Sequence, residues 1–148
     1  MTTRHPSGPS RLAIVGPAEC MRLLESVPVG RLIYTHGGLP AIRLVNFVLD
    51  QDTVVFSTGL GDKFQAAERG DVVAFEADDL DAEHHLGWTV TAIGHLSVLP
   101  AQEAIAAHDR LRLQSWLPIH DAHLVRLAIE SVRGRRLVPW EQRPRTGA

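Results

Sequence analysis

The sequence predicts a mainly β domain, a small closed barrel of about six antiparallel strands with helices at its periphery. Three observations support this fold class. A chain of 148 residues suffices for one hydrophobic core and is too short for two ordinary domains. Most links between the strand-like segments are too short for a helical crossover, so neighbouring strands should run antiparallel. Closing such a sheet into a barrel removes its exposed edges.

The strand-like segments alternate apolar and polar residues or are rich in β-branched residues, and turn residues separate them. They are residues 30–35, 41–50, 53–59, 71–79, 88–99 and 123–140. Gly37 and Gly38 predict a tight hairpin turn between the first two segments, and Gln51 lies in a second turn. In the last segment we expect a bulge near Gly134.

Three further segments have helical spacing of their apolar residues. They are residues 17–27, 62–70 and 101–113. Pro17 suits the first turn of the first helix. In the second helix, Asp62 and Gln65 have the spacing of a capping box, and Gly70 is the expected C-terminal stop.

Composition and charge narrow the class of protein. Hydrophobic residues make up 45% and charged residues 22%, which are globular proportions and argue against disorder. A formal net charge of −2 gives no overall positive field to attract nucleic acid or an anionic membrane. Cys20 is the only cysteine, and no early apolar run is long enough for a signal peptide or a membrane span. We expect a cytoplasmic protein with a mobile lead-in (1–16), one domain (17–140) and a mobile tail (141–148).

Eight histidines raise the question of a metal site. His84 and His85 are adjacent, and His120 and His123 have H-x-x-H spacing. Metal sites need three or four convergent ligands, and no cysteine lies near these histidines. We therefore expect no metal site.

Charged and hydroxyl side chains break the apolar pattern at two places. Arg43 interrupts a segment that is apolar on both faces, where a guanidinium must pair with a carboxylate, reach solvent or face an anion. Ser57, Thr58 and Lys63 bracket a glycine-containing turn that leads into a helix, where hydroxyl and backbone N–H groups can donate to phosphate oxygens. The turn alone lacks the spacing of a P-loop or of the dinucleotide fingerprint, but combined with Arg43 it suggests a phosphate site.

The order and spacing of these motifs resemble the FMN-binding split-barrel family, the pyridoxamine 5′-phosphate oxidase-like proteins, and most closely its small actinobacterial members. The resemblance extends from about Cys20 to Trp140, and its motifs are GRLIYT, GGLPAIRLVNFVLDQDTVVFSTGLGDKFQAAERGDVVAFEADD and GWTVTAIGHLSVL. It implies a six-stranded antiparallel split β-barrel that forms a homodimer, with flavin sites at the subunit interface and a small-molecule substrate.

By matching position, the resemblance also implies which residues contact the cofactor. Arg43 would reach the phosphate or the ribityl chain, and Lys63 would bind the phosphate at the start of its helix. The other implied contacts are Leu44, Val45, Asn46, Phe56, Ser57, Thr58 and Phe64, with Trp88 and Thr89 supplied by the partner subunit. No catalytic acid or base is identified.

The resemblance implies a flavin-dependent oxidoreductase with FMN as its cofactor, and a deazaflavin coenzyme or haem as the alternatives that the family offers. The chain ends in RGRRLVPWEQRPRTGA, which departs from the arginine- and histidine-bearing motif that grips the substrate in pyridoxine-phosphate oxidases. We therefore expect no vitamin B6 oxidation. The competing hypothesis is a non-catalytic carrier or sensor of flavin, deazaflavin or haem on the same barrel.

Overall fold

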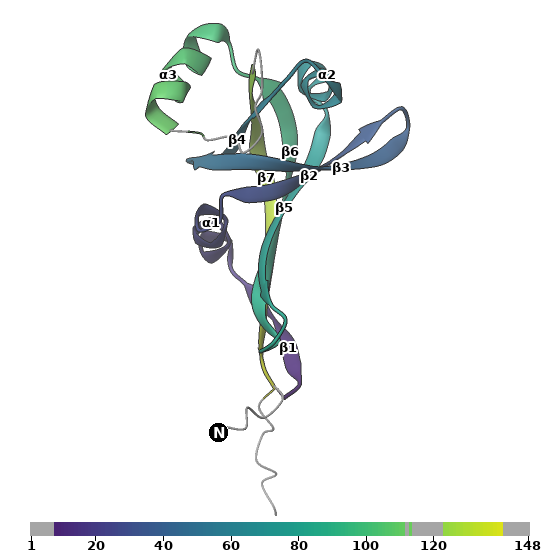
Figure 1. Cartoon of the computed structure of the whole chain (residues 1–148), viewed down its shortest axis with the longest axis vertical. Helices are drawn as coiled ribbons and strands as arrows, with labels where there is room; N and C mark the ends of the chain where they lie inside the picture. Colours follow the sequence, from purple (N-terminus) through teal and green to yellow (C-terminus); the bar gives the residue numbers. More distant parts are fainter. Residues whose placement is uncertain (1–7, 112, 114–122, 141–148) are drawn as a thin grey trace, which may run out of the picture.

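The computed structural model describes residues 8–111, 113 and 123–140, so the predictions for residues 1–7 and 141–148 lie outside the described residues. The elements are β1 (Ser10–Val15), α1 (Pro17–Glu25), β2 (Val29–His36), β3 (Leu39–Asp50), β4 (Thr53–Thr58), α2 (Asp62–Arg69), β5 (Val72–Asp81), β6 (Leu86–Val98), α3 (Ala101–Leu111) and β7 (His123–Pro139). Figure 1 shows the helices outside the sheet, and β5, β6, β7 and β1 extending together away from it as a long ribbon. The predicted mainly β, antiparallel fold class is confirmed.

The sheet closes on itself through β7. Its strand order is β1-β7-β4-β3-β2-β5-β6, and β7 also pairs with β6. The first part of β7 pairs with β4 and the last part with β1, while β6 runs along both parts. The strands β7, β4, β3, β2, β5 and β6 therefore form a ring, and β1 lengthens the ribbon that leaves it.

The structure has one strand more than the sequence predicted. Ser10–Val15, in the segment expected to be a mobile lead-in, forms β1 and pairs along its whole length with β7, from Ser10 opposite Pro139 to Val15 opposite Gly134. Half of its residues are exposed, including Leu12 and Ile14, and none is fully buried. Because backbone hydrogen bonds to a distant segment define this strand, the local sequence carries little burial pattern from which to predict it.

The predicted turns are confirmed. Gly37 and Gly38 have φ angles of 58° and 78° and join β2 to β3, since a two-residue hairpin turn needs positive φ at both positions. Gln51 has a φ of 54° in the turn from β3 to β4. Gly70 ends α2 in the left-handed conformation, with a φ of 70°.

Two local predictions were wrong. α2 has Gly61 at its N-cap without a side-chain cap, and Asp62 is its first helical residue, so the capping box does not form. The bulge lies at Glu130 rather than Gly134, because Ile93 pairs with Ser131 while the next residue, Gly94, pairs with Ile129.

Two apolar clusters hold the fold together. The ring interior is filled by large side chains such as Leu32, Phe56 and Phe75, and the Phe75 ring meets the Phe47 ring edge-on with centroids 4.7 Å apart. A smaller cluster packs α3 against the outside of the ring, and its buried members are Val55, Leu99, Ala107 and Leu124. Among the described residues, no helix is both long and apolar enough to cross a membrane.

The outer face of the sheet carries a row of apolar side chains across four neighbouring strands. Strand register places in this apolar row Ile42 of β3, Ile33 of β2, Ala74 of β5 and Ile93 of β6. Ile42 is 59% exposed and Ile93 is 43% exposed. Isolated exposed apolar residues are ordinary, but a row in register is typical of a surface that another molecule covers.

An acidic pair lies beside the apolar row. Arg31 Nη1 is 3.0 Å from Glu76 Oε2 and 3.1 Å from Asp78 Oδ2. Burial raises the pKa of Glu76 to about 7, with the neighbouring Asp78 adding to the rise and Arg31 opposing it. The Glu76 carboxyl therefore holds its proton over much of the range in which an ordinary glutamate has lost it.

We expect Glu76→Gln to flatten the pH dependence of stability. From about pH 4.5 to pH 7 the folded chain holds a proton that the unfolded chain has released, so the free energy of unfolding should fall as pH rises through this range. Glutamine has no such proton to lose. Urea titrations at pH 5, 6, 7 and 8 measure the effect, with Glu68→Gln on the exposed side of α2 as the control. Parallel pH profiles for wild type and Glu76→Gln would contradict the prediction.

Candidate functional site

Three charged side chains meet where α2 begins. Arg43 of β3 places Nη2 3.9 Å from Asp62 Oδ2. The other carboxylate oxygen of Asp62 accepts a hydrogen bond of 2.9 Å from the backbone N–H of Lys63. Arg43 also donates to the carbonyl oxygen of Ile42 at 2.9 Å, and its side chain is 53% exposed. We call Arg43, Asp62 and Lys63 the charged cluster.

Lys63 is the half-buried member of the charged cluster and the only lysine in the chain. Burial lowers the pKa of its ammonium group, and the positive charge of Arg43 lowers it further, while Asp62 opposes the change. Two cations held this close repel each other. An anion placed between them would relieve that repulsion, which is the electrostatic property of a phosphate site.

Tyr34 of β2 adds a neutral group behind the charged cluster. Its hydroxyl is buried and, among the described residues, has no hydrogen bond of ordinary geometry, although the Asp62 carboxylate is close to it. Burial, and then Asp62, raise the pKa of Tyr34 to about 12. In return, the Tyr34 hydroxyl, the backbone N–H of Lys63 and the Arg43 charge lower the pKa of Asp62, so its carboxylate is ionised.

Ser57 and Thr58 end β4, and three residues, 59–61, separate them from the start of α2. Ser57 is half-buried and Thr58 is buried. Both residues pair through their backbones with the start of β7. In the part of the chain that the structure describes, neither hydroxyl takes part in a hydrogen bond with another side chain, so both remain able to donate to a ligand. Hydroxyl, guanidinium and ammonium groups are the donor types that suit a phosphate, but Ser57 and Thr58 are consecutive residues of β4, so their side chains point to opposite faces of the sheet.

The remaining predicted contacts on β3 and β4 lie on different surfaces. Leu44 and Asn46 alternate with Arg43 and belong to the outer face, where Leu44 is opposite Arg31. Val45 and Phe56 point into the core, and Phe56 is fully buried. A ligand beside β3 could therefore meet Phe56 only through its main chain.

Phe64 and Trp88 lie far apart. Phe64 of α2 packs against the His123 ring, with centroids 4.9 Å apart. His123 is opposite Thr58 and Trp88 is opposite Arg136, so the two positions are separated by thirteen residues of β7. At 3.3 Å per residue this is roughly 40 Å along the strand. In the sheet, β2 and β5 lie between β3, which carries Arg43, and β6, which carries Trp88 and Thr89.

Sequence reasoning missed Asp62 and Tyr34 as members of the site. Asp62 was interpreted only as a helix cap, and Tyr34 only as one residue of a strand. The alternation of β2 places Tyr34 on its inner face, and a lone tyrosine at an inward position could have been noted as a polar group that needs a partner.

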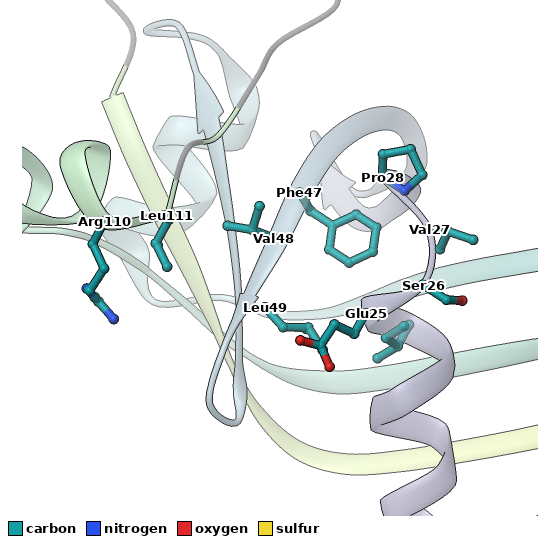
Figure 2. A pocket seen from close by; sticks show the side chains of 10 residues that line it. Glu25, Ser26, Val27, Pro28, Phe47, Val48, Leu49, Arg110 and Leu111 are labelled. Atoms are coloured by element: carbon teal, nitrogen blue, oxygen red, sulfur yellow. The ribbon is translucent and has the colours of Figure 1, made fainter.

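A cavity of about 480 Å³ lies elsewhere on the molecule, between the end of α1, β3 and α3. Figure 2 shows Glu25 to Pro28 on one side of it, Arg110 and Leu111 on the other, and Phe47 to Leu49 between them. Arg110 is held by two hydrogen bonds to Asp50, of 2.8 and 2.9 Å. No predicted cofactor residue lines this cavity, so it is separate from the charged cluster.

Metal-ligating side chains do not gather in the described part of the chain, where no group of three or more His, Cys, Asp or Glu residues could hold an ion. His84 is 2.6 Å from Asp81, and His95 pairs with Glu130. His120 lies outside the described residues.

The closed antiparallel ring with a ribbon of long strands defines a split-barrel protein. A sequence profile described as pyridoxamine 5′-phosphate oxidase matches residues 16–136, and the chain belongs to this family. It is 38% identical over 131 residues to an uncharacterized protein of Mycobacterium tuberculosis, covering 85% of this chain and 86% of that protein.

Two solved structures share the fold and are more than 30% identical to this chain in sequence. One is the FAD binding protein from Mycobacterium smegmatis, with 33% identity, a TM-score of 0.66, and coverage of 83% of this chain and 95% of that chain. The other is a conserved protein of unknown function from Corynebacterium diphtheriae, with 31% identity, a TM-score of 0.70, and coverage of 86% and 98%. The family and these relatives indicate a flavin-binding type of split barrel.

Proposed function

We propose that this chain is a flavin-dependent oxidoreductase that binds the cofactor through its phosphate and acts on a small molecule. The observation that carries the proposal is the charged cluster at the start of α2, where the positive charges of Lys63 and Arg43 act on each other and Asp62 contacts Arg43. The family assignment and the name of the FAD-binding relative support a flavin as the ligand. FMN is the flavin that the sequence predicted.

Each part of the chain would have a defined task. Lys63 and Arg43 neutralise the phosphate, Ser57 and Thr58 donate to its oxygens or to the ribityl chain, and the main chain of β3 borders the ring. The bound flavin would supply the redox chemistry, accepting a hydride from a donor such as a reduced nicotinamide and passing it to an acceptor. The protein would hold and orient the cofactor.

The proposal includes a homodimer, because one chain does not gather the predicted contacts. In the sheet, β2 and β5 separate Arg43 of β3 from Trp88 and Thr89 of β6, so we expect these two residues to reach the flavin from a second copy. The outer face suits such a partner. It carries the apolar row, an acidic pair on β5 (Glu76 and Asp78) and basic residues on β7 (Arg133 and Arg135), with threonines of β6 between the two charged strands. Such a face can pair with its own copy about a two-fold axis.

We expect Ile42→Glu to convert the dimer into a monomer, because it places a charge in the apolar row where a partner would bury it. Sedimentation at micromolar concentration measures the mass. Ile105→Glu is the matched control, since Ile105 is 67% exposed on α3, away from the apolar row. A wild-type chain that sediments as a monomer, or an Ile42→Glu variant that stays dimeric, would contradict this interface.

The visible absorption spectrum of the freshly purified full chain tests the proposed activity. A flavin spectrum that is bleached by NAD(P)H and restored by an electron acceptor is the result expected of an oxidoreductase. A stable flavin spectrum without turnover would support a carrier or sensor instead. Colourless protein that binds neither FMN, FAD nor a deazaflavin on titration would exclude both functions.

A further inference from the structure

Asp62 places a negative charge inside the cluster that is expected to receive a phosphate. Its carboxylate is 3.9 Å from the Arg43 guanidinium and accepts a hydrogen bond from the Lys63 backbone. Asp62 is only partly exposed, and the buried Tyr34 hydroxyl beside it is neutral. The two cations and the one carboxylate leave the charged cluster with a single net positive charge.

The net charge of the cluster decides which phosphate it suits. A phosphate monoester, such as the end of FMN, carries about −1.5 to −2 charges near neutral pH. A phosphodiester that contains a single phosphate, such as the monomethyl ester of FMN, carries one negative charge. The cost of taking an ion out of water rises with the square of its charge, whereas its attraction to a fixed charge rises only in proportion. One net positive charge therefore compensates for a singly charged phosphate better than for a dianion.

Building on the proposed function, we infer that Asp62 is a specificity-determining residue that makes this site prefer a singly charged flavin phosphodiester over the terminal phosphate dianion of FMN. This order reverses the FMN preference expected from the sequence. It follows from the contact of Asp62 with Arg43, which the tertiary structure brings together from α2 and β3, and from the place of Asp62 next to Lys63 at the start of α2.

Three probes that differ only at the phosphate end test the inference: FMN, the monomethyl phosphodiester of FMN, and riboflavin. Quenching of flavin fluorescence at pH 8 gives their dissociation constants for the full-length wild type and for Asp62→Asn. We expect the wild type to bind the phosphodiester at least as tightly as FMN. Asp62→Asn should tighten FMN binding about tenfold, tighten phosphodiester binding by about threefold or less, and leave riboflavin binding unchanged.

Asp71→Asn is the matched control, because Asp71 follows the other end of α2 and pairs with Arg69 at 2.8 Å. It should leave the ratio of FMN to phosphodiester affinity at the wild-type value. A wild type that binds FMN tenfold more tightly than the phosphodiester would overturn the inference without any variant. An equal ratio in wild type and Asp62→Asn would also overturn it. If no protein bound any of the three probes, the proposed function would fail together with the inference.

Discussion

Replacing Lys63 with Met should weaken FMN binding by about ten- to a hundredfold, the usual loss of about 1.5–3 kcal/mol for one charge-assisted hydrogen bond. Methionine keeps the length and apolar body of the half-buried side chain but removes its charge. Fluorescence titration measures the change. Riboflavin, which has no phosphate, should bind the variant and the wild type equally. An unchanged affinity for FMN would contradict the assignment of Lys63 to the phosphate.

Two controls isolate the effect of Lys63. Arg69→Met removes a positive charge from the exposed end of the same helix and should leave FMN affinity unchanged. Because Lys63 is the only lysine, amine-specific reductive methylation labels just this side chain and the N-terminal amine. FMN should slow labelling of Lys63 and not of the N-terminus. If FMN left the labelling rate of Lys63 unchanged, direct contact between Lys63 and FMN would be contradicted.

Replacing Gly94 with Ala should destabilise the fold by about 3 kcal/mol, at the upper end of the usual cost of overpacking. A Cβ atom at this position would lie 1.8 Å from the backbone oxygen of Ala128 and 2.8 Å from its carbonyl carbon. Neither atom belongs to a side chain that could rotate away. β6 and β7 would have to separate next to the bulge at Glu130, where the ring and the ribbon join.

Urea denaturation monitored by circular dichroism measures the loss of stability. Gly59→Ala is the control, because a Cβ atom at Gly59 would meet nothing within 4 Å and its φ needs no glycine. We expect this control to stay within about 0.5 kcal/mol of the wild type. A Gly94→Ala variant as stable as Gly59→Ala would show that the two strands can separate there at little cost.

Local chemistry is sufficient to predict much of the fold. The glycine pair at 37–38 and the left-handed Gly70 specify turns through their own φ angles, and the strict alternation from Trp88 to Leu96 specifies which face of β6 is buried. The short links between strands specify antiparallel pairing. Features defined by contacts between distant segments were missed, as β1 and the bulge at Glu130 illustrate.

The candidate site likewise has features that the sequence predicts and features that only the folded structure shows. Sequence position alone marks Arg43 as a cation in an apolar segment and Lys63 as a cation in the first turn of a helix, and it marks Ser57 and Thr58 as donors before that helix. Sequence alone could not show that Asp62 contacts Arg43, because that distance depends on where the folded chain places the start of α2 relative to β3. Nor could it show that β2 and β5 lie between Arg43 and Trp88 in the sheet.

The sequence by itself determined the fold class, the turns, the family and the cations that would bind a phosphate, since each of these follows from local conformation, residue chemistry or motif order. The tertiary structure decided the net charge of the site and the surfaces on which the predicted contacts lie. Charge balance and proximity are properties of side chains that converge from different strands and helices. No local pattern contains them, because Arg43 and Asp62 meet only when the folded chain brings β3 and the start of α2 together.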